Sequence, residues 1–254
     1  SPVNYTVDYF SWSIGANYKL NDDAAVFARA SRGGRANADR LLFGVVLPDG
    51  SVRKQDAIDY VSQYEIGVKY RSGGFGLFVT GFHAKTEEQN FEATSQRFFD
   101  RVYKATGVEL EAAYKSGILD LRAGATWTDA KISKDNISPA NEGNRPRRQA
   151  NLVYQITPAI DLDKVRFGLN VVGTTKAYAQ DSNELVFPGY TQVNAFVNFR
   201  PLDNVELSLN ANNLFNVVGI TESEEGSITA GANNYIRARS INGRTVSASL
   251  RFDF

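Results

Sequence analysis

The 254-residue sequence predicts an all-β fold of about eleven antiparallel transmembrane β-barrel strands. Apolar and polar residues alternate with a period of two in many segments, and two is the period of a β-strand. Short and long connections also alternate along the chain, as in a membrane barrel with short turns on one rim. No run of about 18 apolar residues occurs, so a transmembrane helix is not predicted.

Five strands are predicted in the N-terminal half, each with apolar side chains at every second position. They are residues 10–20 (Trp12, Ile14, Tyr18), 24–32, 60–70 (Tyr64, Ile66, Val68), 75–85 and 103–115 (Val108, Leu110, Tyr114). Residues 75–85 are apolar on both faces in places, so their register is less well defined. Asn21-Asp22-Asp23 and Arg71-Ser72-Gly73-Gly74 have the composition of tight turns.

Six strands are predicted in the C-terminal half. They are residues 118–132 (Leu119, Leu121, Trp127), 148–157 (Leu152, Tyr154), 164–175 (Phe167, Leu169), 189–200, 205–215 and 243–254. In the last of these, Val246, Ala248, Leu250, Phe252 and Phe254 alternate with polar residues. This strand alone fits either a soluble sandwich or a membrane strand between lipid and water.

The connections decide between these two classes. Short connections start at Asn21, Arg71, Ser116, Pro158 and Pro201, and long connections start at Gly33, Thr86, Ser133, Lys176 and Asn216. A Greek-key sandwich gives no reason for this regular asymmetry, whereas an outer-membrane barrel has short periplasmic turns and long extracellular loops.

Charged residues on the other face of the predicted strands favour the same class. They are Glu65, Lys69, Glu109, Glu111, Arg122, Arg166, Glu206 and Arg251. Unpaired charges are costly in a dry core but are expected in a wet lumen, where they solvate and pair with one another. These side chains therefore argue against a sandwich.

Strand direction predicts that the barrel is larger than this chain. If the short turns are periplasmic, the last strand descends, and so does the first of eleven. Bacterial single-chain barrels have even strand numbers. Residues 1–254 are therefore expected to form the C-terminal part of a barrel whose first strands are absent.

The composition excludes several functional classes. The 28 basic residues balance 28 acidic ones, so a nucleic-acid partner is not predicted. Without cysteine the chain has neither disulfides nor thiolate metal sites. His83 is the only histidine, so a metal site built from several histidines is not possible, and no other histidine is available as the base of a nucleophile–base pair. His83 is expected in the lumen or at the membrane interface. No enzymatic activity and no cofactor are predicted.

Several segments, in order along nearly the whole chain, resemble the C-terminal barrel of TonB-dependent outer-membrane receptors. They are residues 209–216 (LNANNLFN), 243–254 (GRTVSASLRFDF), 64–70 (YEIGVKY) and 107–114 (GVELEAAY), with Arg145-Pro146 before Asn151-Leu152. The resemblance implies a 22-stranded barrel, of which eleven strands are half, in the outer membrane of a Gram-negative bacterium. It also implies an N-terminal plug domain, which is absent from these residues.

The resemblance further implies uptake of a scarce ligand, such as a ferric siderophore, haem, cobalamin or an oligosaccharide, with energy delivered through the TonB complex. The partners would be the plug, TonB, the ligand and membrane lipid including lipopolysaccharide. The alternatives are a free-standing porin-like barrel of about 12 strands that passes solutes by diffusion, and an outer-membrane phospholipase-type enzyme, which the missing catalytic constellation disfavours.

The long loops supply the predicted ligand-binding residues, which are Arg145, Arg147, Tyr178, Tyr235, Arg237 and Arg239. Arginine pairs with carboxylate, catecholate or phosphate groups, and tyrosine stacks on rings. Contact with lipopolysaccharide or simple solvation of the loops is the alternative role. Phe252 and Phe254 at the end of the chain are predicted to form a membrane-assembly signal, or else to be interface aromatics.

Overall fold

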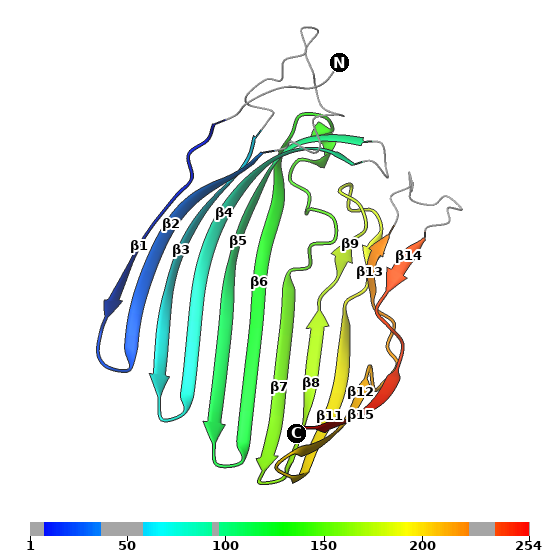
Figure 1. Cartoon of the computed structure of the whole chain (residues 1–254). Helices are drawn as coiled ribbons and strands as arrows, with labels where there is room; N and C mark the ends of the chain where they lie inside the picture. The colour runs from blue at the N-terminus through cyan, green and yellow to red at the C-terminus, as the bar shows by residue number, and fades with distance from the viewer. Residues whose placement is uncertain (1–7, 37–57, 93–96, 224–236, 254) are drawn as a thin grey trace.

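The computed structural model describes residues 8–36, 58–92, 97–223 and 237–253. In these residues eleven strands form one antiparallel sheet, in which each strand pairs with the next long strand along the chain (Figure 1). The predicted all-β class and the predicted count of about eleven strands are confirmed. Within the described part of the chain, no helix has the length and apolar character needed to cross a bilayer.

The sheet begins at β1 and ends at β15. Its strands are β1 (Trp12–Lys19), β2 (Ala24–Ala36), β3 (Ile58–Ser72), β4 (Phe75–Glu92), β5 (Arg97–Ser116), β6 (Leu119–Asp135), β7 (Leu152–Leu162), β8 (Val165–Thr174), β11 (Tyr190–Leu202), β12 (Val205–Asn212) and β15 (Thr245–Phe252). Smaller elements lie in the connections: the 3₁₀ helix η3 (Pro139–Asn141) and the strand pairs β9 (Ala177–Tyr178) with β10 (Val186–Phe187) and β13 (Ile220–Ser223) with β14 (Ala238–Ser240).

The five short turns lie together at the lower end of the sheet in Figure 1, as the sequence predicted. The turn between β3 and β4 shows the cause. Gly73 and Gly74 both have positive φ, 55° and 84°, and two such residues match the right-handed twist of the flanking strands. Because glycine has no Cβ, it adopts these angles without steric cost.

Two predicted connections are wrong. Residues 86–102 were expected to form a long loop, but β4 continues to Glu92 and β5 begins at Arg97, so the two strands form one long hairpin with Glu92 opposite Arg97. The ladder persists where the apolar alternation fades, because backbone pairing does not require apolar side chains. Pro158 was expected to start a turn, yet it lies inside β7, and the turn follows Leu162.

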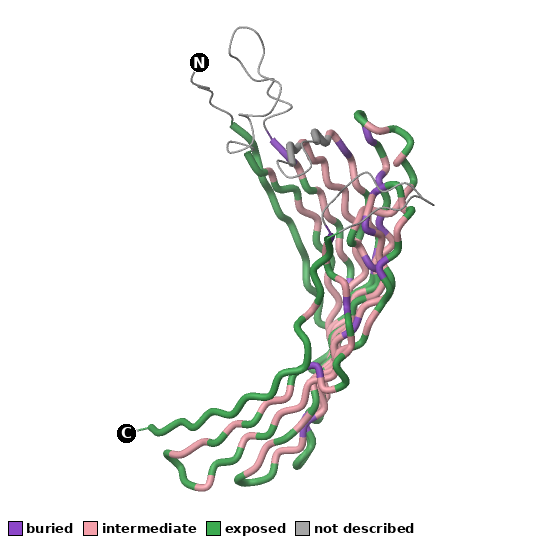
Figure 2. Tube along the Cα trace, turned by 90° about the vertical axis from the view of Figure 1, so that its right-hand side faces the viewer, coloured by how far each residue is buried: buried purple, intermediate pink, exposed green. Residues whose placement is uncertain are grey.

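The sheet is a single curved layer (Figure 2). Its two faces differ in chemistry, because the side chains of each strand alternate between them. One face carries an apolar row in which Tyr18, Val26, Val68, Val79 and Leu110 are successive cross-strand partners. Several of its large side chains are exposed, for example Ile66 at 68% and Tyr18 at 69%. An apolar surface of this extent requires an apolar environment rather than water. We call this the outward face.

The opposite face, here called the inward face, carries the charged residues. Arg166 forms ion pairs with Asp120 at 2.9 Å and with Asp161 at 3.2 Å, and Arg200 pairs with Glu206 at 2.6 Å. The prediction that inward charges pair with one another is confirmed for these residues. Aromatic rings also cover glycines on this face. The ring of Phe27 lies so close to Gly67 that a Cβ there would be only 2.4 Å from it.

Candidate ligand-binding loop cluster

The long connections lie at the upper rim of the sheet, opposite the short turns (Figure 1). Three of them carry predicted ligand-binding residues within described segments, and the first two are residues 136–151, between β6 and β7, and residues 175–189, between β8 and β11. The hairpin formed by β13 and β14 belongs to a third connection. The contacts that join these three segments define the loop cluster.

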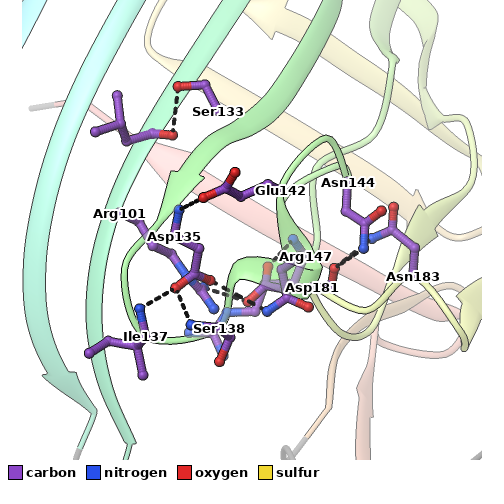
Figure 3. A network of polar contacts seen from close by, with 12 residues as sticks. Arg101, Ser133, Asp135, Ile137, Ser138, Glu142, Asn144, Arg147, Asp181 and Asn183 are labelled. Carbon is purple, nitrogen blue, oxygen red and sulfur yellow. Dashed lines mark hydrogen bonds and ion pairs between the residues drawn. The ribbon is translucent and has the colours of Figure 1, made fainter.

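A buried arginine fixes the first two connections to the sheet (Figure 3). The Arg101 guanidinium donates through Nε to Asp135 at 2.7 Å and through Nη1 to Asp181 at 2.6 Å. The three side chains are only 5%, 0% and 9% exposed. Removal of one partner from a buried ion pair leaves a buried charge without compensation, so this contact holds the loop of Asp181 firmly against β5 and β6.

Asp135 organises the chain that follows β6. Its carboxylate accepts hydrogen bonds from the backbone N–H groups of Ser138 at 2.8 Å and Ile137 at 3.1 Å. The carboxylate lies eight residues beyond Trp127, above the apolar band of the outward face. Burial alone would raise the pKa of Asp135, but these hydrogen bonds and the charge of Arg101 outweigh it and hold the pKa below its usual value.

Asp181 and Asn183 connect the second loop to the first. The backbone N–H of Arg147 donates to Asp181 Oδ1 at 2.9 Å, and the N–H of Arg145 donates to Asn183 Oδ1 at 3.0 Å. The Asn183 amide donates in return to the Arg145 carbonyl at 2.8 Å. Asn183 has a positive φ of 59°, which asparagine tolerates better than most residues. The backbone around both arginines is therefore fixed by side chains of another loop.

Arg148 joins this pair of loops to the β13–β14 hairpin. Its backbone N–H donates to the Tyr178 carbonyl at 2.7 Å, and its guanidinium contacts Glu222 at 3.1 Å and the Ser223 carbonyl at 2.9 Å. Glu222 also pairs with Arg239 at 3.2 Å. Residues from three connections therefore form one continuous set of polar contacts.

The structure brings four of the six predicted ligand-binding residues into this set: Arg145, Arg147, Tyr178 and Arg239. The side chain of Arg145 is half-buried and donates to the Asn151 carboxamide, while its Nε is buried without a partner in the described residues. Arg239 is 82% exposed and Arg237 is also exposed. Tyr235 lies outside the described residues. No contact tests whether any of these side chains binds a ligand.

Sequence reasoning missed the residues that hold the cluster together: Arg101, Asp135, Asp181 and Asn183. Arg101 lies 34 residues from Asp135 and 80 from Asp181, and nothing in the local pattern pairs them. Arg101 was also assigned to a loop, which hid its place on a strand.

The remaining predicted positions lie away from the cluster. Phe252 is 53% exposed at the end of β15, where it pairs with Val205, and Phe254 lies outside the described residues. His83 lies on the outward face, where its Nδ1 is 2.9 Å from Thr106 Oγ1. In the described segments, no group of three or more His, Asp or Glu side chains is placed to hold a metal ion.

Comparison with known proteins identifies the fold. The profile of the family described as TonB dependent receptor-like, beta-barrel matches residues 1–214. The siderophore receptor PiuA from Acinetobacter baumannii superposes with a TM-score of 0.76 at 17% identity, over 97% of this chain and 36% of that one. FyuA, the ferric yersiniabactin uptake receptor from Yersinia pestis, gives 0.73 at 20% identity, over 95% and 37%.

The copper transporter OprC gives a TM-score of 0.75 at 17% identity, over 96% of this chain and 39% of that one. The chain thus spans 36% to 39% of the length of these three proteins. No curated protein sequence matches it. The family and these neighbours are receptors and transporters, in agreement with the prediction that the protein is not an enzyme. Because the family profile covers most of the sequence, the chain belongs to the TonB-dependent receptor-like β-barrel family.

Proposed function

We propose that this chain supplies barrel wall and extracellular ligand-capturing loops to a TonB-dependent transporter in the outer membrane of a Gram-negative bacterium. The transported ligand is a scarce anionic chelate such as a ferric siderophore. In this proposal residues 1–254 are the C-terminal part of the barrel, and the plug domain and the TonB-contacting segment lie in the N-terminal region of the full-length protein.

The observation that carries the proposal is the loop cluster. Arg145, Arg147, Tyr178 and Arg239 come from three connections, yet they share one set of hydrogen bonds and ion pairs at one rim. The buried contacts of Arg101 hold two of these connections to the sheet. A set of cations and an aromatic ring on fixed backbone binds an anionic ligand with little loss of conformational entropy.

The exposed arginines indicate the chemical class of the ligand. Arg237 and Arg239 are exposed, and only one acidic side chain, Glu222, pairs with Arg239 among the described residues. Guanidinium groups donate two parallel hydrogen bonds to carboxylate or catecholate oxygens, the groups that chelate ferric iron. Haem, cobalamin and oligosaccharides are the alternative ligand classes.

The experiment replaces both exposed arginines, Arg237→Gln and Arg239→Gln, in the full-length protein. Iron-starved cells that express it are given radiolabelled ferric chelates. Since a hydrogen bond to a charged group contributes about 1.5–3 kcal/mol, the double variant is expected to bind the transported chelate at least tenfold more weakly. Arg251→Gln is the control, because Arg251 is 72% exposed but pairs with Asp253 near the short turns.

Three results would contradict the proposal. Unchanged uptake by the double variant would remove these arginines from the binding site. Uptake that persists after the proton-motive force is abolished would indicate passive diffusion through a porin-like barrel. Uptake of a neutral oligosaccharide by the wild-type protein, with no uptake of any ferric chelate, would assign a different ligand class.

A further inference from the structure

Five adjacent strands carry a row of basic residues on the outward face. Arg32 on β2 is the cross-strand partner of Ser62 on β3, which pairs with Lys85 on β4. Lys85 pairs with Lys104 on β5, and Lys104 pairs with Lys131 on β6. Four of five consecutive positions are therefore cationic. Since adjacent strands lie about 4.8 Å apart, the three lysines fall within roughly 10 Å along the sheet.

The row lies on the apolar face and not on the inward face. Lys104 alternates with Thr106, Val108 and Leu110 on one side of β5, and Val108 and Leu110 are exposed at 44% and 39%. Directly below the lysines, toward the short turns, the next cross-strand row contains His83, Thr106 and Asp129. Six polar side chains on β4, β5 and β6 thus interrupt a surface that is otherwise apolar.

The height of the row corresponds to the edge of a bilayer. Ser62 lies ten residues above Ser72, the last residue of β3 beside the short turn. Ten residues rise about 33 Å along a strand, and a tilt of 35–45° reduces this to about 25 Å, the height of the apolar band in membrane barrels. Tyr64 and Trp127 lie just below the row, where interfacial aromatics are found.

The charges of this row are open to a ligand. Lys85 pairs with Glu87 at 2.5 Å and Lys131 with Asp129 at 3.4 Å, but the lysine side chains are 44% and 60% exposed. Exposed ion pairs of this kind are weak and exchange readily. Lys104, between them, is exposed and forms no ion pair in the described segments. Arg32 lies 4.1 Å from the centre of the Tyr60 ring, a cation–π contact that leaves its donors available.

We propose that Lys85, Lys104 and Lys131, with His83 and Thr106 below them, form a binding site for the phosphorylated headgroup of an outer-leaflet glycolipid. The site rests on the outer-membrane location given under the proposed function. Ammonium groups bind phosphate through charge-assisted hydrogen bonds, and the row of polar groups below them offers partners to sugar hydroxyls. The apolar surface beneath contacts the acyl chains, so the headgroup of the lipid lies on polar side chains and its tails lie on apolar ones.

The test uses the full-length protein in detergent micelles, titrated with bisphosphorylated lipid A and followed by native mass spectrometry. The triple variant Lys85→Gln/Lys104→Gln/Lys131→Gln is expected to bind lipid A about tenfold to hundredfold more weakly at low salt, since each cation near an anionic lipid surface contributes to binding. At high salt, or with dephosphorylated lipid, the wild-type protein is expected to bind the lipid only slightly more tightly than the triple variant does.

The matched control is Lys19→Gln/Lys115→Gln/Lys164→Gln, which removes three exposed lysines beside the short turns and should leave binding unchanged. The proposal is overturned if the first triple variant binds lipid A as the wild type does, if the control loses equal affinity, or if wild-type protein binds dephosphorylated lipid equally well. Displacement of the lipid by inorganic phosphate at the same concentration would reassign the site to free phosphate. Lipid binding is read on purified protein, so a receptor that takes up no ferric chelate would refute the proposed function and leave this result standing.

Discussion

Replacement of Arg101 by methionine tests whether the buried arginine holds the loop cluster together. The substitution preserves approximate volume but leaves Asp135 and Asp181 facing each other, with side chains 0% and 9% exposed. Loss of one partner of a buried ion pair costs roughly 3–5 kcal/mol. Since each 1.4 kcal/mol is a factor of ten, opening of the cluster should become roughly 10² to 4 × 10³ times more frequent.

Hydrogen exchange measures this opening at defined amides. The backbone N–H of Ser138 donates to Asp135, and the N–H of Arg147 donates to Asp181, so both should exchange faster in Arg101→Met. The amides of β8, within the sheet, should keep their protection. Mass spectrometry of peptic fragments from the full-length protein in detergent gives both rates in one measurement.

A matched control separates burial from charge. Arg251→Met also removes one arginine from an ion pair, but Arg251 is 72% exposed, and an exposed pair contributes about 1 kcal/mol or less. Its effect on loop exchange should stay below about fivefold. Neutralising both acids as well, in Arg101→Met/Asp135→Asn/Asp181→Asn, should restore part of the protection. An Arg101→Met effect no larger than the control's would refute the reasoning.

Two further predictions concern packing and pH. Gly107→Val should destabilise the barrel by about 1–3 kcal/mol in urea unfolding, because a Cβ there would lie 2.4 Å from the ring of Phe82 and 2.4 Å from a backbone oxygen. Gly76→Val, where nothing lies within 4 Å, is the control, and equal loss in both would contradict the packing argument. Because the pKa of Asp135 is lowered, its stabilisation of the cluster is complete above the ordinary value of 3.8 and disappears as pH falls below it, so loop exchange corrected for intrinsic rates should rise there. Asp135→Asn should show no such pH dependence.

The sheet could be predicted from the sequence because its signal is local. Alternation of side chains, as in Tyr64, Ile66 and Val68, assigns one face of a strand to apolar residues, and Gly73-Gly74 marks a turn by backbone preference. The prediction failed where this local signal fades. Residues 86–102 lose the apolar alternation above the apolar band of the outward face, although backbone pairing continues to Glu92.

The loop cluster could be predicted only in part. Arg145, Arg147, Tyr178 and Arg239 were predicted from their residue types to bind a ligand, and that role stays a prediction; their place in the cluster is observed. That three connections meet was not predictable, because the contacts of Arg148 with Tyr178 and Glu222 join segments that carry no mutual sequence signal.

The sequence by itself determined the class, the strand order and the two faces of this protein, because a period of two and short turns act over a few residues. The tertiary structure alone decided which side chains meet across strands and loops. Arg101 reaches Asp181 across 80 residues of sequence, and Lys85, Lys104 and Lys131 align only because three registers place them in one row. Both arrangements depend on long-range pairing, and a pattern within one segment does not encode its partner.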